Sequence, residues 1–448
     1  MNKRGFLKTS GAFVAGGMLS SLVADEPKGA ARTNWAGNYR YSTDQLHIPN
    51  SLEEVQEVVK SRSKLRALGT RHSFNGVADS TANQISLKNF QKMELDSESR
   101  SVKVGGGVAY GQVAPYLDKN GYALHNLASL PHISVVGACA TATHGSGNKN
   151  GNLATPVSAI KFVTASGDVA VLSREKDRER FHGAVVSLGA LGVVTELTLD
   201  VQPRFDVSQV VYENLPFGEL RSHFEEIFSS GYSVSLFTDW QNHRATQVWI
   251  KRRIEQGDSP TSSAEFFGAT LARAKLHPLA GHSAENCTEQ MGIPGPWYER
   301  LPHFRMNFTP SSGDELQTEY FVPRDKGYEA VLAMERLRDH IAPHLQISEL
   351  RTIDADVLWM SPCYKRAAMA IHFTWKPEWP AVKRVLPMIE EQLAPFDPRP
   401  HWAKLYTTSP SRLQSLYVKL PEYKELLKHY DPNGKFRNAF LETSLYGA

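Results

Sequence analysis

Residues 66–80 read RALGTRHSFNGVADS. The segment predicts the end of a strand, a tight turn at Gly69, and a loop that holds His72 and Ser73. Backbone amides in a glycine-containing loop of this kind can hold a phosphate group. A buried, hydrogen-bonded histidine would fit the same sequence. This loop alone therefore leaves two functions open for His72, a structural one and the attachment of a cofactor.

The segments around this loop predict a first half of short strands and helices. Residues 51–62, SLEEVQEVVKSR, predict a helix with Ser51 as N-cap and Glu54 closing a capping box. Further strands are predicted at 64–69, 84–87, 100–106 and 193–203, a hairpin at 156–173, and helices at 108–121 and 177–187. Residues 125–150 are rich in Gly, Ala, Ser and Thr, so their backbone can approach a ligand closely.

From about residue 206 the sequence has a different pattern. Strands are predicted at 232–240, 245–252, 316–323, 347–354, 367–375 and 402–407, and a helix at 327–341. Runs of strands separated by a few helices are typical of an α+β fold. We therefore expect a second domain built on a largely antiparallel sheet.

Two of these strands carry polar residues on one face. Glu349 and Arg351 are two residues apart and share a strand face, as do His372 and Thr374, while Lys404 adds an ammonium group from a third predicted strand. For any one strand, a solvated outer face is the alternative. Adjacent strands of this kind favour a cleft for a polyhydroxylated molecule, because Arg and Lys donate to hydroxyl groups and Glu accepts from them.

Composition limits the class of protein. A length of 448 residues favours two domains. The net charge is +3, with acidic and basic residues well mixed, so the sequence gives no sign of nucleic-acid binding. The cysteines, Cys139, Cys287 and Cys363, lie far apart and predict neither a metal site nor a complete set of disulfides.

The first 24 residues predict an export signal. MNKRGFLKTS is basic, and GAFVAGGMLSSLVA is a short apolar run that ends in small residues near Ala24. The stretch KRGFLK resembles a twin-arginine signal with lysine in the first position, and ordinary secretion or lipid-free anchoring are the alternatives. We expect export to the periplasm or the extracellular space. No later segment is apolar for long enough to span a bilayer.

Other common site motifs are weak or missing. VGGGVAYG at 104–111 is glycine-rich but lacks the acidic residue that completes a Rossmann fingerprint. THGSG at 143–147 fits either a nucleotide site or a tight turn. The sequence has no G-x-S-x-G elbow, and its histidine spacings do not form a metal set.

Several long segments in the same order resemble the vanillyl-alcohol-oxidase (PCMH) type of FAD flavoprotein, in particular the alditol oxidases of its aldonolactone-oxidase branch. They are RALGTRHSFN, ASLPHISVVGACATATHGSG, LGALGVVTELTL, SELRT, AIHFTWKPEWPAV, RPHWAKLY and HYDPNGKFRNAFL. The resemblance implies an FAD-binding domain at 35–205, with subdomains at about 35–110 and 111–205. A substrate domain would follow at 206–420, and residues 421–448 would return to the FAD domain.

The resemblance also implies roles for individual residues. His72 would be linked covalently to the flavin 8α-methyl group, and the loop 67–73 would hold the pyrophosphate. The implied cofactor-binding residues are Ala67, Leu68, Gly69, Thr70, Arg71, His72, Ser73, Ser129, Ser134, Gly137, Thr141, Ala142, Thr143, His144, Val193 and Val194. The implied substrate-binding residues are Ser129, Glu349, Arg351, His372, Thr374 and Lys404, with Arg351, His372 and Lys404 catalytic.

The implied activity is oxidation of the terminal primary alcohol of a polyol such as xylitol or sorbitol to the aldose. Hydride would pass to flavin N5, and dioxygen would be reduced to hydrogen peroxide. Arg351 and Lys404 would stabilise oxyanion character on the substrate, and His372 would take its proton. Within the branch, a sugar-1,4-lactone oxidase or dehydrogenase is the alternative. A flavin-free carbohydrate-binding protein is the alternative from another class. The sequence leaves the oligomeric state open, a monomer included.

Overall fold

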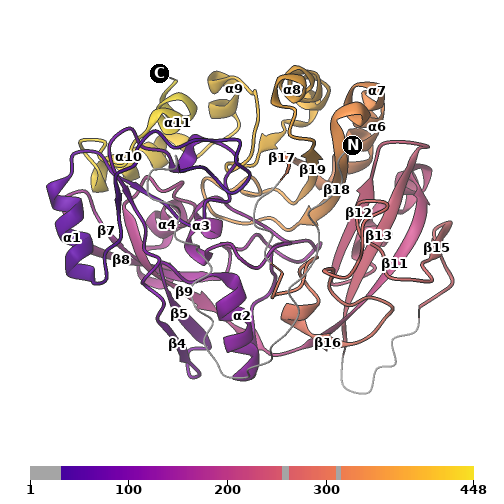
Figure 1. Ribbon diagram of the computed structural model, residues 1–448, viewed down its shortest axis with the longest axis horizontal. Helices are drawn as coiled ribbons and strands as arrows, with labels where there is room; N and C mark the ends of the chain where they lie inside the picture. Colours follow the sequence, from indigo (N-terminus) through magenta and orange to yellow (C-terminus); the bar gives the residue numbers. More distant parts are fainter. Residues whose placement is uncertain (1–31, 255–261, 309–313, 448) are drawn as a thin grey trace, which may run out of the picture.

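The computed structural model describes residues 32–254, 262–308 and 314–447 (Figure 1). The predicted export signal at 1–24 lies outside these residues. No helix within the described ranges is both long and apolar enough to cross a membrane.

The loop that holds His72 follows a strand of a small parallel sheet near the N-terminus. Its strands are β1 (Leu46–His47), β2 (Arg66–Ala67) and β3 (Gln84–Ile85), in the order β1-β3-β2. Helix α1 (Leu52–Ser61) precedes β2 and is capped as predicted by the Ser51 side chain. The Glu54 carboxylate, however, accepts from the backbone N–H of Asn50 and not of Ser51. Val55 and Val59 of α1 pack in a cluster with Leu65, Ile85 and Phe436.

A five-stranded sheet forms the second part of this half. Its order is β4-β5-β9-β7-β8, and its strands are β4 (Met93–Asp96), β5 (Ser101–Gly105), β9 (Val193–Asp200), β7 (Val157–Val163) and β8 (Val169–Ser173). Around it lie α2 (Tyr110–Lys119), α3 (Val135–Ala140), α4 (Arg174–Val185) and the short pair β6 (Tyr122–Ala123) and β10 (Gln202–Pro203). The predicted hairpin turns at Gly167, whose φ of +85° suits glycine.

A ten-stranded antiparallel sheet dominates the second half (Figure 1). Its strands are β11 (Asp206–Pro216), β12 (Ser233–Thr238), β13 (Arg244–Ile254), β14 (Glu265–Phe266), β15 (Ala269–Leu271), β16 (Gly295–Pro296), β17 (Leu316–Pro323), β18 (Leu345–Ile353), β19 (Ala368–Trp375) and β20 (Arg399–Pro400). Helices α5 (Leu220–Ser229), α6 (Gly327–Glu335), α7 (Arg338–Ile341) and α8 (Trp379–Leu393) bury one face. The predicted α+β class, with a largely antiparallel second half, is confirmed.

The end of the chain packs against the first half. Helices α9 (Pro410–Ser415), α10 (Leu420–Tyr430) and α11 (Ala439–Leu441) lie beside the N-terminal elements (Figure 1). Between α10 and α11, two backbone carbonyl groups accept hydrogen bonds from the region of β2: Leu65 N, just before the strand, donates to Lys435 O at 3.0 Å, and the Arg66 side chain donates from Nη1 to Phe436 O at 2.7 Å.

One predicted strand is wrong. Residues 402–404 form a turn, because Ala403 N donates to His401 Nδ1 at 3.1 Å and Lys404 N donates to His401 O at 3.0 Å, and 405–407 belong to no strand. The sheet ends at β20, and Lys404 therefore enters the site from a loop. The sequence prediction also missed β4 and the long strand β11.

Candidate active site

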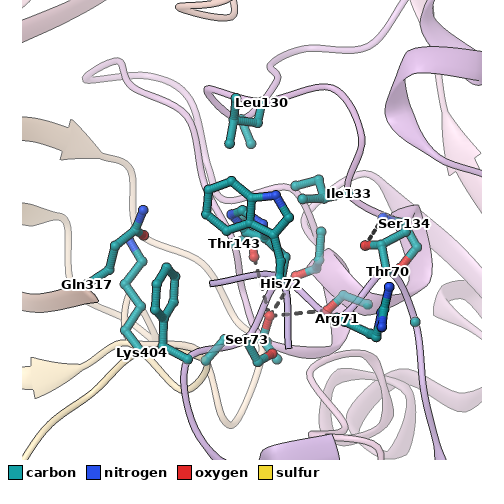
Figure 2. Close-up of a pocket in the computed structure, with 18 of the residues that line it drawn as sticks. Thr70, Arg71, His72, Ser73, Leu130, Ile133, Ser134, Thr143, Gln317 and Lys404 are labelled. Atoms are coloured by element: carbon teal, nitrogen blue, oxygen red, sulfur yellow. Dashed lines mark hydrogen bonds between the residues drawn. The ribbon is translucent and has the colours of Figure 1, made fainter. Parts of the chain in front are cut away.

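A cavity of about 510 Å³ lies between the loop after β2, the segment 128–144 and the uncovered face of the large sheet. Figure 2 shows Thr70, His72 and Ser134 from the first half on one side of it, with Gln317 and Lys404 on the other. The cavity thus brings together the two groups of residues that the sequence analysis had selected separately.

Fourteen of the sixteen residues predicted to bind the cofactor line this cavity. They are Ala67, Leu68, Gly69, Thr70, Arg71, His72, Ser73, Ser129, Ser134, Gly137, Thr141, Thr143, His144 and Val194. Ala142 and Val193 do not line it. Val193 points to the other face of β9 and packs with Val55 and Ile85, and Ala142 is buried in the core of the first half.

The loop after β2 has the features of an anion site. Within the described structure, the backbone N–H groups of Gly69, Thr70, His72 and Ser73 donate no hydrogen bond to the protein. A Cβ atom on Gly69 would lie 2.8 Å from Ser134 Oγ, and one on Gly137 would lie 2.7 Å from the same atom. Gly69 therefore lets the loop approach the N-cap of α3 closely, and Gly137 leaves room for the Ser134 side chain within the same helix. Backbone N–H groups without a protein acceptor, next to glycines that have no side chain, fit the pyrophosphate of a dinucleotide.

His72 lies in an aromatic setting. Its ring centroid is 4.6 Å from that of Trp35, and its Nδ1 lies 3.2 Å from Nε2 of His132. Burial, together with His132 and Lys404, holds the pKa of His72 well below its ordinary value. Burial lowers the pKa of His132 to about 4. Both rings are therefore neutral near pH 7, and a neutral imidazole nitrogen is a nucleophile.

Polar side chains cross the cavity face of the large sheet in register. Glu349 of β18 lies opposite His372 of β19, which lies opposite Glu319 of β17. In a neighbouring row Thr374 lies opposite Gln317, so five polar side chains share one patch of sheet. The intervening residues of these strands, such as Leu350 and Ile371, are buried in the core on the other face. The alternation predicted from the sequence is thus present in the structure.

Glu319 is the centre of the charge network, although the sequence analysis did not select it. Its carboxylate lies 2.7 Å from Lys404 Nζ, accepts from Arg351 Nη2 at 2.9 Å and lies 3.2 Å from His144 Nε2. Burial alone would raise the pKa of this carboxyl group, but these three neighbours hold it well below its usual range. Glu319 is therefore ionised, and its charge keeps two cations at the cavity.

His372 links this network to the strand beside it. Its Nδ1 lies 2.7 Å from Lys404 Nζ and its Nε2 lies 3.0 Å from Thr374 Oγ1. Burial and the charge of Lys404 hold the pKa of His372 well below its ordinary value. A neutral ring that accepts at Nδ1 and donates from Nε2 satisfies both contacts. Burial also lowers the pKa of Lys404, against the effect of Glu319.

All six residues predicted to bind substrate line the cavity: Ser129, Glu349, Arg351, His372, Thr374 and Lys404. The prediction missed further polar residues that line it, among them Glu319, Gln317, His303 and His401. Glu319 and Gln317 had a detectable signal, since they sit at alternate positions of LQTEYFVP. His303 and His401 lie outside the alternating pattern, so the sequence carries no comparable signal for them.

Comparisons with known proteins agree with this architecture. Residues 43–173 match the FAD binding domain family, and residues 312–444 match the D-arabinono-1,4-lactone oxidase family. The chain is 47% identical over 422 residues to alditol oxidase from Streptomyces sp. (strain IKD472 / FERM P-14339), an alignment that covers 93% of this chain and 99% of that protein. It is 27% identical to L-gulonolactone oxidase from Bos taurus, over 94% of this chain and 99% of that one.

Two solved structures share the fold at low identity. Cholesterol oxidase from B. sterolicum has a TM-score of 0.74 and 14% identity, over 93% of this chain and 96% of that one. Glucooligosaccharide oxidase from Acremonium strictum, which carries a 6-S-cysteinyl, 8α-N1-histidyl FAD, has a TM-score of 0.69 and 13% identity. That match covers 91% of this chain and 93% of the other.

Proposed function

The chain belongs to the aldonolactone oxidase branch of the FAD-dependent oxidoreductases that act on CH–OH groups, and from this premise we propose that it is an alditol oxidase. Its substrates would be linear polyols such as xylitol or sorbitol. The terminal primary alcohol is oxidised to the aldose, and dioxygen is reduced to hydrogen peroxide.

The observation that carries this proposal is the row Glu349–His372–Glu319 with Lys404 and Arg351 beside it. An alcohol is a very weak acid, so its oxidation requires stabilisation of oxyanion character and a proton acceptor. Lys404 and Arg351 supply positive charge at the cavity, and both side chains are largely buried, where such charge has a larger effect than in water. His372 Nδ1, the ring nitrogen that carries no hydrogen, supplies the acceptor once the substrate hydroxyl replaces Lys404 Nζ as its donor.

The remaining polar groups suit the rest of a polyol chain. Glu349 accepts from hydroxyl groups, while Thr374 and Ser129 both donate and accept. All three line the cavity. Fixing several hydroxyls at once orients one terminal carbon for reaction, which lowers the entropic part of the barrier. FAD, when bound, supplies the hydride acceptor.

A sugar-1,4-lactone oxidase or dehydrogenase is the second candidate, because the D-arabinono-1,4-lactone oxidase family matches residues 312–444. The higher identity to alditol oxidase, 47% against 27% for the gulonolactone oxidase, favours the alditol. Peroxide release measured with xylitol, sorbitol and aldono-1,4-lactones tests the choice. We expect turnover with the alditols. Turnover with the lactones alone would assign the chain to the second candidate.

We also propose that the flavin is covalently bound through His72. The neutral ring of His72 lies at the cavity wall, and glucooligosaccharide oxidase carries a histidyl FAD on the same fold. Acid-precipitated protein is expected to retain flavin fluorescence. His72→Ala protein should release all of its flavin into the supernatant. A wild-type supernatant that contains all of the flavin would rule out the bond.

The export prediction for residues 1–24 is part of the proposal. Fractionation of cells that express the full chain, with N-terminal sequencing of the product, tests it. We expect protein outside the cytoplasm that has lost about the first 24 residues. Intact protein confined to the cytoplasm would contradict export.

A further inference from the structure

His303 and Lys251 lie beside the substrate-binding face, and the proposed reaction gives neither of them a role. His303 comes from the segment between β16 and β17, and Lys251 from β13. Both are buried, with exposed fractions of 7% and 1%. A buried lysine is costly unless its charge has partners, so its presence beside a substrate site calls for a physical explanation.

Three acceptors surround the Lys251 ammonium group. Nζ donates to Leu301 O at 2.5 Å and to Pro302 O at 3.0 Å, and lies 3.4 Å from His303 Nδ1. An ammonium group has only donors, so Nδ1 of His303 must accept and carries no hydrogen. The contact with Lys251 therefore favours one tautomer of His303.

The other ring nitrogen of His303 faces a substrate-binding residue. Nε2 lies 2.7 Å from Glu349 Oε1. Arg351 and His303 together hold the pKa of Glu349 below its usual range despite burial, so the carboxylate only accepts. Nε2 must therefore donate, which is the tautomer that Lys251 favours. The second oxygen, Oε2, lies 3.5 Å from Arg351 Nε.

We propose that His303 and Lys251 are positioning residues for polyol recognition: Lys251 fixes the tautomer of His303, and His303 holds Glu349 so that its second oxygen receives a substrate hydroxyl. This inference rests on the proposed function of Glu349. Ring packing restrains His303 further, since its centroid lies 5.5 Å from that of Phe237 and 5.3 Å from that of Trp249.

Removing the donor tests the role of His303. His303→Phe keeps an aromatic ring between Phe237 and Trp249 but cannot donate to Glu349. We expect KM for xylitol to rise about 10-fold, with a smaller change in kcat and unchanged flavin content, because one hydrogen bond to a charged group is lost. His303→Gln, whose amide can donate, should recover part of the loss. Equal effects of Phe and Gln would overturn the role.

Thr288→Val is the matched control. Thr288 Oγ1 donates to Pro302 O at 2.8 Å, so the substitution disturbs the same segment without touching the contact between His303 and Glu349. We expect its KM to stay near that of the wild type. A rise in KM equal to that of His303→Phe would show that the segment matters only structurally.

The pH dependence separates a positioning role for Lys251 from a structural one. The titratable or charged groups that act on Lys251 are Cys287, His303, Glu349 and Arg351, and burial is the main reason that its pKa falls to about 7. Lys251 is charged below this pH, so KM should rise about 3- to 10-fold between pH 6 and 8.5 as the ammonium group is lost. Lys251→Met should have a high KM that does not change across this range. A wild-type pH profile retained in Lys251→Met would overturn the proposal.

Nitrogen NMR of ¹⁵N-histidine-labelled holoenzyme tests the tautomer without turnover. We expect His303 to be protonated at Nε2 in the wild type and to lose part of this preference in Lys251→Met, where only Glu349 still favours that tautomer. A wild-type ring protonated at Nδ1 would overturn the inference. The NMR result does not depend on which substrate the enzyme oxidises. Oxidation of lactones but not of alditols would contradict the proposed function, yet the spectrum would still show which nitrogen of His303 is protonated.

Discussion

At the scale of single residues, the site depends on a balance between two buried carboxylates and two cations. Glu319 and Glu349 are both ionised, and they face Lys404 and Arg351 over distances of 2.7 to 3.5 Å. In a medium of low dielectric constant, the two carboxylates would not be buried as charged groups without the two cations, nor the cations without the carboxylates. The cations are therefore held in place before substrate arrives, which is the condition for electrostatic catalysis.

Lys404→Ala should lose most of the turnover while retaining flavin. The substitution removes one of the two positive charges that Glu319 holds at the cavity and also the donor to His372 Nδ1. Loss of one such group typically costs about 10²–10³ in kcat. Steady-state peroxide release and the flavin-to-protein absorbance ratio provide the measurement. Near-normal kcat with normal flavin content would contradict the role of Lys404.

The acid limb of the pH–rate profile should lie well below pH 6.5. The proposed acceptor is neutral His372, and burial together with the Lys404 charge holds its pKa well below this ordinary value. Lowering the pH therefore protonates the ring and stops the reaction only under distinctly acidic conditions. In Lys404→Met one cause of the low pKa is absent, so the acid limb of the residual activity should move to higher pH. An acid limb at the same pH in both proteins would exclude His372 as its source.

Single residues also show where sequence reasoning works and where it stops. Glu349, Arg351, His372 and Thr374 could be selected because period-two spacing places them on one strand face. Lys404 was selected, but for the wrong structural reason, since it comes from a turn. His303 lies more than forty residues before Glu349 in the chain, and no local pattern reports a contact over that separation.

At the scale of elements, the two faces of β18 and β19 have separate functions. One face carries the polar row, and the other packs under α6 and α8. Paired substitutions on the two faces of β19 can separate these functions. Ile371 is fully buried on the core face, and Thr374 lines the cavity.

Ile371→Ala should lower stability and leave KM almost unchanged. Removing a buried Ile side chain and leaving a cavity typically costs about 2–5 kcal/mol. Thr374→Val, which conserves volume but removes the hydroxyl bonded to His372 Nε2, should instead raise KM for xylitol with little change in melting temperature. Thermal unfolding and steady-state kinetics on both variants provide the comparison. A change of KM in Ile371→Ala as large as that in Thr374→Val would contradict the separation.

Most elements were predictable because their periodicity is local, and the exceptions have identifiable causes. The segment 402–407 alternates as a strand would, yet the His401 side chain and carbonyl group accept from the backbone that follows and close a turn. Strand β4 is only four residues long: Met93 and Leu95 alternate with Glu94 and Asp96 and pack against the core of the first half, and β4 pairs with β5, but so short a run does not stand out in the sequence. A local hydrogen-bonded turn thus overrode the strand pattern at 402–407, and the shortness of the run concealed β4.

At the scale of the whole molecule, residues distant in sequence assemble the loop that faces the cofactor. Asn438, near the C-terminus, donates from Nδ2 to Gly76 O at 2.9 Å and to Asp79 O at 2.8 Å. Arg66 of β2 bonds carbonyl groups of Leu188 and Phe436, which come from two further segments. The sequence showed that the final segment resembles that of its family but could not show these bonds, because backbone carbonyl groups carry no sequence signal.

Asn438→Ala should therefore act on the flavin site from outside it. The substitution removes the bonds to Gly76 and Asp79 and also the cap that Oδ1 provides to Leu441 N at 3.0 Å. Each lost hydrogen bond costs about 0.5–1.5 kcal/mol of stability. The segment that is destabilised contains Gly76 and Asp79 and directly follows the cofactor loop. We expect a lower flavin-to-protein ratio, with kcat per bound flavin close to that of the wild type, since no group at the sheet face is touched.

Asn120→Ala, which removes one exposed bond to Tyr116 O at the end of α2, is the matched control and should keep full flavin content. If Asn438→Ala protein carried full flavin, or if both variants lost flavin equally, the C-terminal segment would have no specific part in forming the cofactor site.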